Sequence, residues 1–493
     1  MAAITKRSED YSRWYQDVIQ AAELAENSQV RGCMVIRPNG YAIWENIQAI
    51  LDKRFKELGH VNAYFPLLIP KSFLAKEAEH VEGFAKECAI VTHHRLKQVT
   101  ENGKVTVMPD PASKLDEEYV IRPTSETVIW DSYRKWIQSY RDLPILINQW
   151  ANVMRWEMRT RMFLRTTEFL WQEGHTAHAT AQEGRDETLQ MLETYRWFAE
   201  EILAMPVIPG VKTANERFAG AQETYSIEAM MQDKKALQAA TSHDLGQNFA
   251  KAFDVTYQDA EGKVEHVWAT SWGMSTRIIG ALIMTHSDDD GLVLPPRIAG
   301  TKAVIVPIWK NDEEMTQVCE VADKLAADLR PVIGPVHTDK RDKMRPGWKY
   351  GEWERKGVPL RIELGPRDLQ NEQVMLAARH DRNKQAVPFG ELVGAVESEL
   401  DRIQQDLYER ALKRREEATV VIDTWEDFLD LYQNQDGGFA HCHWCGEGAC
   451  ENTIQDKTKV TIRNIPFERD ESEGTCVHCD KPSIGRVIFA QAY

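Results

Sequence analysis

Arginine and glutamate recur among large apolar side chains in the first half of the chain. Three segments hold them: residues 122–127 (RPTSET), 155–157 (RWE) and 163–175 (FLRTTEFLWQEGH). Arginine stays charged in proteins, and its planar guanidinium matches phosphate and carboxylate groups. Burying such charges is costly unless a partner compensates for them. The three segments therefore predict a site for a charged, phosphorylated ligand.

The order of these segments along the chain is more specific than any one of them. Residues 155–169 have the pattern of two strands joined by a turn, and residues 271–280 (SWGMSTRIIG) that of a strand entering a helix. Between them lies Gln-x-x-Thr-x-His, at Gln238, Thr241 and His243. Together the motifs resemble those of class II aminoacyl-tRNA synthetases, and specifically of prolyl-tRNA synthetases. The resemblance covers residues 11–493.

This resemblance implies an enzyme that converts L-proline and ATP, which binds with Mg²⁺, to prolyl-adenylate and then charges tRNA(Pro). Such a reaction depends on positioning and on cations that stabilise developing phosphate charge. A single arginine is better explained as an exposed ion pair of little energy, so the ordered set carries the argument. The resemblance implies catalytic roles for Arg155 and Arg277. It implies ATP contacts for Arg155, Glu157, Arg165, Thr166, Gln238, Thr241, Ser275 and Arg277.

A second set of residues is expected to recognise proline. A secondary ammonium has two donors and a positive charge, so a carboxylate and a hydroxyl suit it, as at Glu126 and Thr124. Trp272 is a further candidate for the wall around the ring, although core packing explains it equally well. The family has glycine more often where Ala239 and Ala240 stand. By resemblance, the proline site consists of Thr124, Glu126, Arg155, Trp171, Glu173, His175, Phe218 and His243.

Residues 351–369 (GEWERKGVPLRIELGPRDL) resemble the anticodon-binding domain that several class II synthetases share. The matching positions are Glu354, Arg361, Arg367 and Asp368. An arginine fork on the acceptor edge of guanine is a sound basis for reading the proline anticodon. Arg367 stands where lysine is common in the family, which keeps the charge and changes the geometry. The alternative is an ordinary salt-bridged surface.

Five of the eight cysteines lie between residues 442 and 479. Without an export signal, such a cluster favours metal over disulfides. Cys442 and Cys445 could form one knuckle of a symmetrical zinc site with the pair at 476 and 479. The resemblance favours a structural Zn²⁺ held instead by Cys445, Cys450, Cys476 and Cys479, with Cys442 as a spare thiol.

The spacing of apolar residues predicts the elements that position these motifs. Ile43, Ile47 and Leu51 share a helix that ends near Gly59, and the next run, 62–70, is an edge strand or interface because of Pro66. Residues 92–118 are polar and predict a hairpin or insertion. A helix ends near Pro206, and strands fill much of 250–270. Beyond Pro296, strands and helices alternate, with a long helix over 392–417.

The predicted fold class is therefore α+β, in three domains. We expect an antiparallel-sheet catalytic domain at 1–298, an α/β anticodon-binding domain at 299–408 and a small α+β zinc-binding domain at 409–493. The 493 residues are 43% hydrophobic with a net charge of −16, which argues against non-specific nucleic-acid binding. No apolar run approaches the roughly 20 residues of a membrane span, and no secretory signal is visible. We expect a cytoplasmic homodimer, the dimer by resemblance.

Three further expectations concern the limits of the assignment. The competing functions are a non-catalytic tRNA-binding or regulatory module and another class II enzyme, such as a threonyl or glycyl synthetase. The stretch between His175 and Thr241 is too short for the inserted editing domain of many bacterial prolyl enzymes. The chain ends in Tyr493, and the resemblance implies that this terminus reaches the catalytic site, the alternative being a frayed end.

Overall fold

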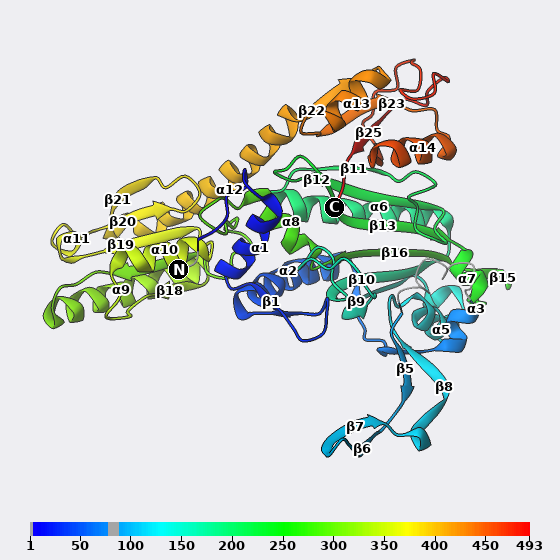
Figure 1. Cartoon of the computed structure of the whole chain (residues 1–493), viewed down its shortest axis with the longest axis horizontal. Coiled ribbons are helices and arrows are strands. Elements are labelled where there is room, and N and C mark those ends of the chain that lie inside the picture. Colours follow the sequence, from blue (N-terminus) through cyan, green and yellow to red (C-terminus); the bar gives the residue numbers. More distant parts are fainter. Residues whose placement is uncertain (1–2, 77–87) are drawn as a thin grey trace.

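The computed structural model describes residues 3–76 and 88–493. A large sheet fills the centre of the molecule, a smaller sheet with its own helices lies at the left of Figure 1, and the C-terminal segment lies at the upper right. Helix α12 (Leu392–Glu417) runs between the last two regions (Figure 1). The predicted α+β class, with an antiparallel main sheet and a separate α/β unit, is confirmed.

The main sheet has eleven strands in the order β22-β23-β25-β24-β11-β12-β13-β16-β10-β9-β3. Its neighbours are antiparallel except at the two ends, where β22–β23 and β3–β9 are parallel. Alternate side chains of each strand point to the same face, so one face can carry a site while the other packs on helices. From one end, the sheet contains β3 (Val61–Asn62), β9 (Ile145–Met154), β10 (Glu168–His178), β16 (Trp268–Ser275), β13 (Ala236–Gly246), β12 (Glu223–Met230) and β11 (Val207–Val211).

Helices cover this sheet and form the main core with it. The helix predicted from Ile43 to Leu58 is α2 (Pro38–Glu57), and Gly59 follows it with a φ of 94° that suits glycine. Its buried face joins Trp14 and Tyr15 of the first helix in one apolar cluster. The helices of this part are α1 (Tyr11–Ala21), α2, α5 (Glu126–Trp136), α6 (Ala181–Trp197), the π-helix η4 (Phe198–Ile202), α7 (Asn248–Ala252) and α8 (Arg277–His286), with the 3₁₀ turn η3 (Tyr140–Asp142).

The segment around Pro66 differs from the single strand expected at 62–70. It forms two short strands, β3 and β4 (Leu68–Pro70), separated by extended chain. The backbone N–H of Phe65 donates to the Gln149 side chain, and its carbonyl accepts from Arg122 Nη1 at 2.7 Å. Proline has no N–H to donate to a ladder, so side chains satisfy the backbone here.

The predicted hairpin is present and projects from the body at the bottom of Figure 1. It pairs β6 (Leu96–Glu101) with β7 (Lys104–Pro109) and lies below β5 and β8 of the small sheet β4-β8-β5 in this view. The remaining elements of the first 270 residues are β1 (Ala25–Asn27), β2 (Met34–Ile36), α3 (Lys71–Lys76), β5 (Ile90–His93), η2 (Pro111–Ser113), β8 (Lys114–Ile121), β14 (Thr256–Gln258) and β15 (Val264–His266). Residues 259–263 join the last two strands, in the region where strands were predicted.

The predicted α/β region is a five-stranded sheet in the order β18-β17-β19-β20-β21, with its own apolar core. Strand β17 is parallel to both neighbours, and the last two pairings are antiparallel. Its elements are β17 (Ala303–Pro307), α9 (Asp312–Ile333), β18 (Val336–Thr338), α10 (Pro346–Arg355), β19 (Leu360–Leu364), α11 (Pro366–Gln370), β20 (Gln373–Ala378), β21 (Lys384–Pro388) and η5 (Phe389–Glu391).

The C-terminal segment is not an isolated sheet. Strand β24 pairs with β11 at Gly210–Pro466 and Val211–Ile465, so its strands continue the main sheet. The chain then returns to the centre of the molecule at its C-terminus (Figure 1). The elements are β22 (Thr419–Ile422), α13 (Trp425–Gln433), β23 (Phe439–His443), α14 (Gly448–Thr458), β24 (Thr461–Pro466) and β25 (Arg486–Ala490). None of the helices in residues 3–76 and 88–493 combines the length and apolarity needed to cross a bilayer.

Candidate active site

The two-strand motif predicted at 155–169 is the β9–β10 pair with its connecting loop. Arg155 follows β9, and its Nε donates to the carbonyl of Pro123 at 2.9 Å. Its guanidinium lies 5.5 Å from the centre of the Trp171 ring, within the range of a cation–π contact. In the loop, Arg165 Nη1 lies 4.0 Å from Glu157 Oε2. The motif therefore places two arginines and a glutamate at one end of the β9–β10 pair.

The segment RPTSET lies between β8 and α5. Arg122 is fully buried and donates to the carbonyls of Phe65 and Asn152, which holds the loop in place. Thr124 donates to Glu126, the first residue of α5, and Ser125 Oγ donates to Glu173 Oε1 at 2.5 Å. The bond from Ser125 connects the loop to β10, and the Glu126 carboxylate and the Thr124 hydroxyl of the loop lie side by side.

A buried ion pair on β10 lies beside this loop. His175 Nε2 is 3.0 Å from Glu173 Oε2, and both side chains are at most 3% exposed. Burial alone raises the pKa of Glu173, but the hydrogen bond and charge of His175, with Ser125 and Gln149, offset it and lower the pKa. Burial likewise lowers the pKa of His175, but Glu173 and the charge of Glu126 raise it overall. The two groups thus hold each other in the charged form.

Another part of the wall is built by Phe218 and His243, whose ring centroids are 4.7 Å apart. Thr224 links them: its Oγ1 accepts from the Phe218 N–H and lies 3.0 Å from His243 Nδ1. Burial and the positive charge of His175 lower the pKa of His243 to about 3, so this imidazole is neutral at physiological pH. His243 pairs with Ser271, which pairs with His175, so the neutral imidazole lies on the same face of the sheet as the charged pair.

Gln238 and Thr241 share a face because of a β-bulge. Ile227 pairs with Ala240 and Glu228 pairs with Gln238, so Ala239 has no partner on β12. Side chains of a regular strand alternate, and a separation of three residues would place Gln238 and Thr241 on opposite faces. Because Ala239 is an extra residue in the strand, Gln238 and Thr241 instead point to the same face. The irregular spacing Gln-x-x-Thr-x-His thus puts all three side chains on the side of the sheet that carries Glu173.

The strand-to-helix motif is β16 followed by α8. Ser275 ends β16, and Arg277 begins α8, where partial burial of its guanidinium lowers its pKa to about 10. Its Nη2 donates to the terminal main-chain oxygen of Tyr493 at 2.8 Å. The phenol of Tyr493 donates to Asp233 at 2.6 Å. The end of the chain is therefore fixed beside Arg277, as the resemblance implied.

These parts surround one cavity of about 720 Å³. All fifteen residues predicted to bind proline or ATP, and both predicted catalytic arginines among them, line it. Trp272 also borders the cavity, but it is 1% exposed and its indole packs against Phe55, His60 and Tyr195 in the core, which favours the packing explanation. Lining residues that the prediction omitted include Glu216, Thr224, Ser271 and Arg463. Ser271 follows from strand alternation in its motif, whereas no motif marks the other three.

The four residues predicted to contact the anticodon come from α10, β19 and α11. Arg361 is held between Glu354 and Glu363, with its side chain 10% exposed, and its guanidinium lies over the Tyr350 ring. Asp368 accepts from the Gly365 N–H at the start of α11. Arg367 is exposed at the same helix terminus. Arg361 and Glu354 thus form a fixed pair, and Arg367 is the most accessible member of the group.

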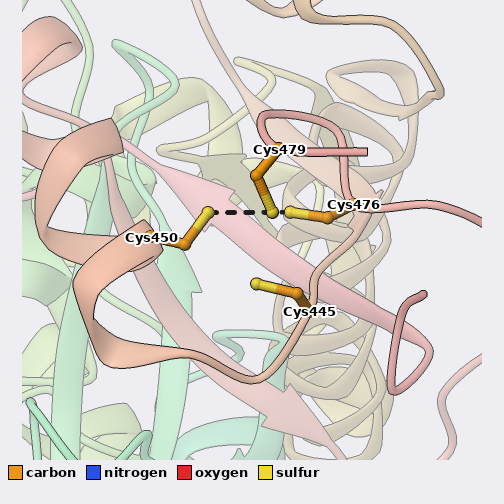
Figure 2. A group of neighbouring side chains, drawn as sticks. All are labelled: Cys445, Cys450, Cys476 and Cys479. Carbon is orange, nitrogen blue, oxygen red and sulfur yellow. Dashed lines mark hydrogen bonds between the residues drawn. The ribbon is translucent and has the colours of Figure 1, made fainter. Parts of the chain in front are cut away.

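Four cysteines converge in the C-terminal segment, as Figure 2 shows. The sulfur atoms of Cys445, Cys450, Cys476 and Cys479 lie within 4.8 Å of one another, and those of Cys450 and Cys476 are 3.7 Å apart. Cys442 is buried and lies outside this group. A tetrahedral site with metal–sulfur distances of about 2.3 Å needs sulfurs roughly 3.8 Å apart, so the four thiols fit such a metal.

Known proteins match the chain over its whole length. Family models match at residues 106–286 (tRNA synthetase class II core domain (G, H, P, S and T)), 302–399 (anticodon binding domain) and 425–493 (prolyl-tRNA synthetase, C-terminal). The proline–tRNA ligase of Porphyromonas gingivalis is 58% identical over 490 residues, 99% of each chain. The chain belongs to the prolyl-tRNA synthetase family. The proline–tRNA ligases of Parabacteroides distasonis and Bacteroides fragilis are 58% and 56% identical, again over 99% of each chain.

Proposed function

We propose that the protein is a proline–tRNA ligase that forms prolyl-adenylate from L-proline and ATP and transfers the prolyl group to the 3′ end of tRNA(Pro). The observation that carries this proposal is the single cavity lined by every residue expected to bind proline or ATP. Four of those residues have a buried polar atom without a hydrogen-bond partner among the described residues: Thr166, Trp171, His175 and Arg277. Buried polar atoms are normally paired, so such a set fits a polar ligand.

We assign proline to one end of the cavity and the phosphates of ATP to the other. Glu126 and Thr124 accept from the proline ammonium, and Phe218 and Trp171 enclose its ring. Arg155 and Arg277 bind the phosphates, and Arg155 also holds the proline carboxylate in line with the α-phosphate. Glu157, Arg165, Thr166, Gln238, Thr241 and Ser275 complete the ATP site, where Mg²⁺ offsets part of the phosphate charge. Catalysis then rests on alignment and on fixed positive charge.

Two other functions fit less well. A non-catalytic binding module has no need for several arginines around one cavity, yet Arg155, Arg165 and Arg277 all line it. A threonyl enzyme would hold the substrate hydroxyl with zinc at the site, but no cysteine is among the lining residues. The adjacent carboxylate and hydroxyl suit the secondary ammonium of proline.

Amino-acid-dependent pyrophosphate exchange across the twenty amino acids tests the function directly. We expect exchange with proline, and a loss of a hundredfold or more in Arg155→Ala and Arg277→Ala, because each loses a fixed charged donor worth about 2 to 4 kcal/mol. Thermal unfolding confirms that each variant is folded. Near-normal exchange in a folded variant would remove that arginine from the mechanism, and exchange with another amino acid would change the substrate.

We further propose that Cys445, Cys450, Cys476 and Cys479 hold one structural Zn²⁺. Four thiolates leave no open position for substrate, so the metal would stabilise the C-terminal segment and take no part in the reaction. Metal analysis of purified protein should give one zinc per chain. The ion should be lost or weakened in Cys450→Ser and retained in Cys442→Ser. The reverse pattern would favour the symmetrical site that includes Cys442.

We propose that the region 299–408 reads the proline anticodon through Arg367 and Asp368, with Glu354 and Arg361 as a preformed pair beside them. Arg367→Ala should slow aminoacylation of tRNA(Pro) about tenfold or more, since one bidentate base contact is worth about 1 to 3 kcal/mol. Proline-dependent exchange should stay within twofold, because this region lies apart from the cavity. Arg382→Ala, another exposed arginine of the region, serves as control. An equal loss of exchange and charging would make Arg367 structural.

We also propose an archaeal- and eukaryotic-like subtype that does not hydrolyse alanyl-tRNA(Pro). Residues 179–235 form α6, η4, β11 and β12, the elements that connect β10 to β13. An added domain needs about 100 residues. Alanine enters a proline pocket with a penalty of only about 1 to 3 kcal/mol, so correction falls to another protein. Preformed alanyl-tRNA(Pro) should decay at the enzyme-free rate. Faster decay that a mutation in this chain abolishes would overturn the proposal.

The remaining proposals concern organisation. We propose domains at 1–298, 299–408 and 409–493; each family match lies within one of them, and α12 belongs to both the second and the third. We propose a cytoplasmic homodimer, with the dimer contact around α2 and β3. Sedimentation of the purified protein measures the oligomeric state.

A further inference from the structure

Arg463 lines the cavity although it belongs to the C-terminal segment, about 190 residues beyond Arg277 in sequence. It lies on β24 at an irregularity in the pairing with β25. Ile462 pairs with Phe489 and Asn464 with Ile488, so Arg463 is the unpaired extra residue of a bulge. Bulges turn a side chain away from the direction that strict alternation gives, and they recur beside active sites. The bulge directs Arg463 toward the cavity.

The contacts of Arg463 hold its side chain in one orientation. Its Nε donates to Glu228 Oε2 at 3.1 Å and its Nη1 donates to Thr461 Oγ1 at 2.8 Å. The side chain is only 8% exposed, and Glu228 is fully buried. Nη2 takes part in neither bond. A guanidinium fixed in this way retains a donor for a ligand in the cavity.

A structural ion pair does not by itself account for Arg463. Glu228 already has a buried cation in Lys212, whose Nζ is 2.9 Å from Glu228 Oε1. Arg463 is therefore a second cation for one carboxylate, although the negative charge of Glu216 also acts on Lys212. Burying unbalanced charge is costly unless an anion compensates for it. An anion bound in the cavity beside Arg463 would supply negative charge for this second cation.

The position of Glu228 shows where that anion would bind. Glu228 pairs with Gln238 across β12 and β13, so the two side chains share the cavity face of the sheet. Arg277 is near enough for the charges of Arg165, Glu228 and Arg463 to act on it. Three arginines from distant parts of the sequence thus surround one end of the cavity. This density of guanidinium donors suits a polyphosphate better than a single carboxylate.

We propose that Arg463 is a further ATP-binding residue, contributed by the C-terminal segment, which donates to the triphosphate alongside Arg277. The proposal rests on the proposed function in one respect, that ATP is the anion bound at this end of the cavity. It makes the C-terminal segment a part of the active site through a side chain that no motif includes.

The test compares Arg463→Met with Lys212→Met. Both remove a cation from Glu228, but only the first removes a donor that lines the cavity. In proline-dependent pyrophosphate exchange, Arg463→Met should raise the KM for ATP at least tenfold, since hydrogen bonds to charged groups are strong, and leave the KM for proline within twofold. Calorimetry without proline should show the same loss of ATP affinity. Lys212→Met should keep ATP affinity within threefold.

Each other outcome decides against the proposal. Unchanged ATP affinity in folded Arg463→Met overturns it, as does an equal rise in Lys212→Met or an equal rise in the KM for proline, because those results indicate a structural role. Arg463→Lys, which keeps a cation against Glu228, should lose about threefold; if the methionine variant does not fold, unchanged affinity in this variant overturns the proposal. Wild-type protein without proline-dependent exchange would contradict the proposed function, while ATP calorimetry would still test Arg463.

Discussion

The register of β10 against β9 and β16 is the constraint on which the site depends. It sets Glu173 opposite Gln149 on one side and Gly273 on the other, and His175 opposite Ser271. Because alternate residues share a face, Trp171, Glu173 and His175 all point into the cavity. A slip of one residue would exchange this face with the packed one and bury the wrong side chains. The backbone pairing thus fixes which side chains can meet a ligand.

Gly174 shows how closely the other face is packed. A Cβ at this position would lie 2.2 Å from the Trp272 ring, which rests over the strand and contacts Phe55 of α2. The indole can occupy this place only because glycine has no side chain. The core under the sheet and the cavity above it are therefore two sides of one arrangement. The rigid core gives the charged groups above it fixed positions, which a preorganised site requires.

Charge in the cavity is balanced by groups from distant parts of the chain. Glu173 and His175 stabilise each other's charged forms on one strand, whereas Arg277 meets the terminal oxygen of Tyr493 and Glu228 meets both Lys212 and Arg463. The pairing of β11 with β24 makes these last contacts possible, since it joins the C-terminal strands to the main sheet. The C-terminal segment is consequently part of the architecture of the site.

The sequence by itself determined the family, the α+β class, most of the elements and fifteen of the residues that line the cavity. It could do so because ordered motifs combine residue type with spacing, as in Arg155, Thr241 and Arg277. The tertiary structure alone decided three matters: that Pro66 divides its strand, that Trp272 packs in the core, and that Arg463 reaches the cavity. The reason is the same in each case. Each depends on contacts between residues far apart in sequence: side-chain bonds to the backbone, strand register or a β-bulge. A local sequence pattern does not identify those distant partners.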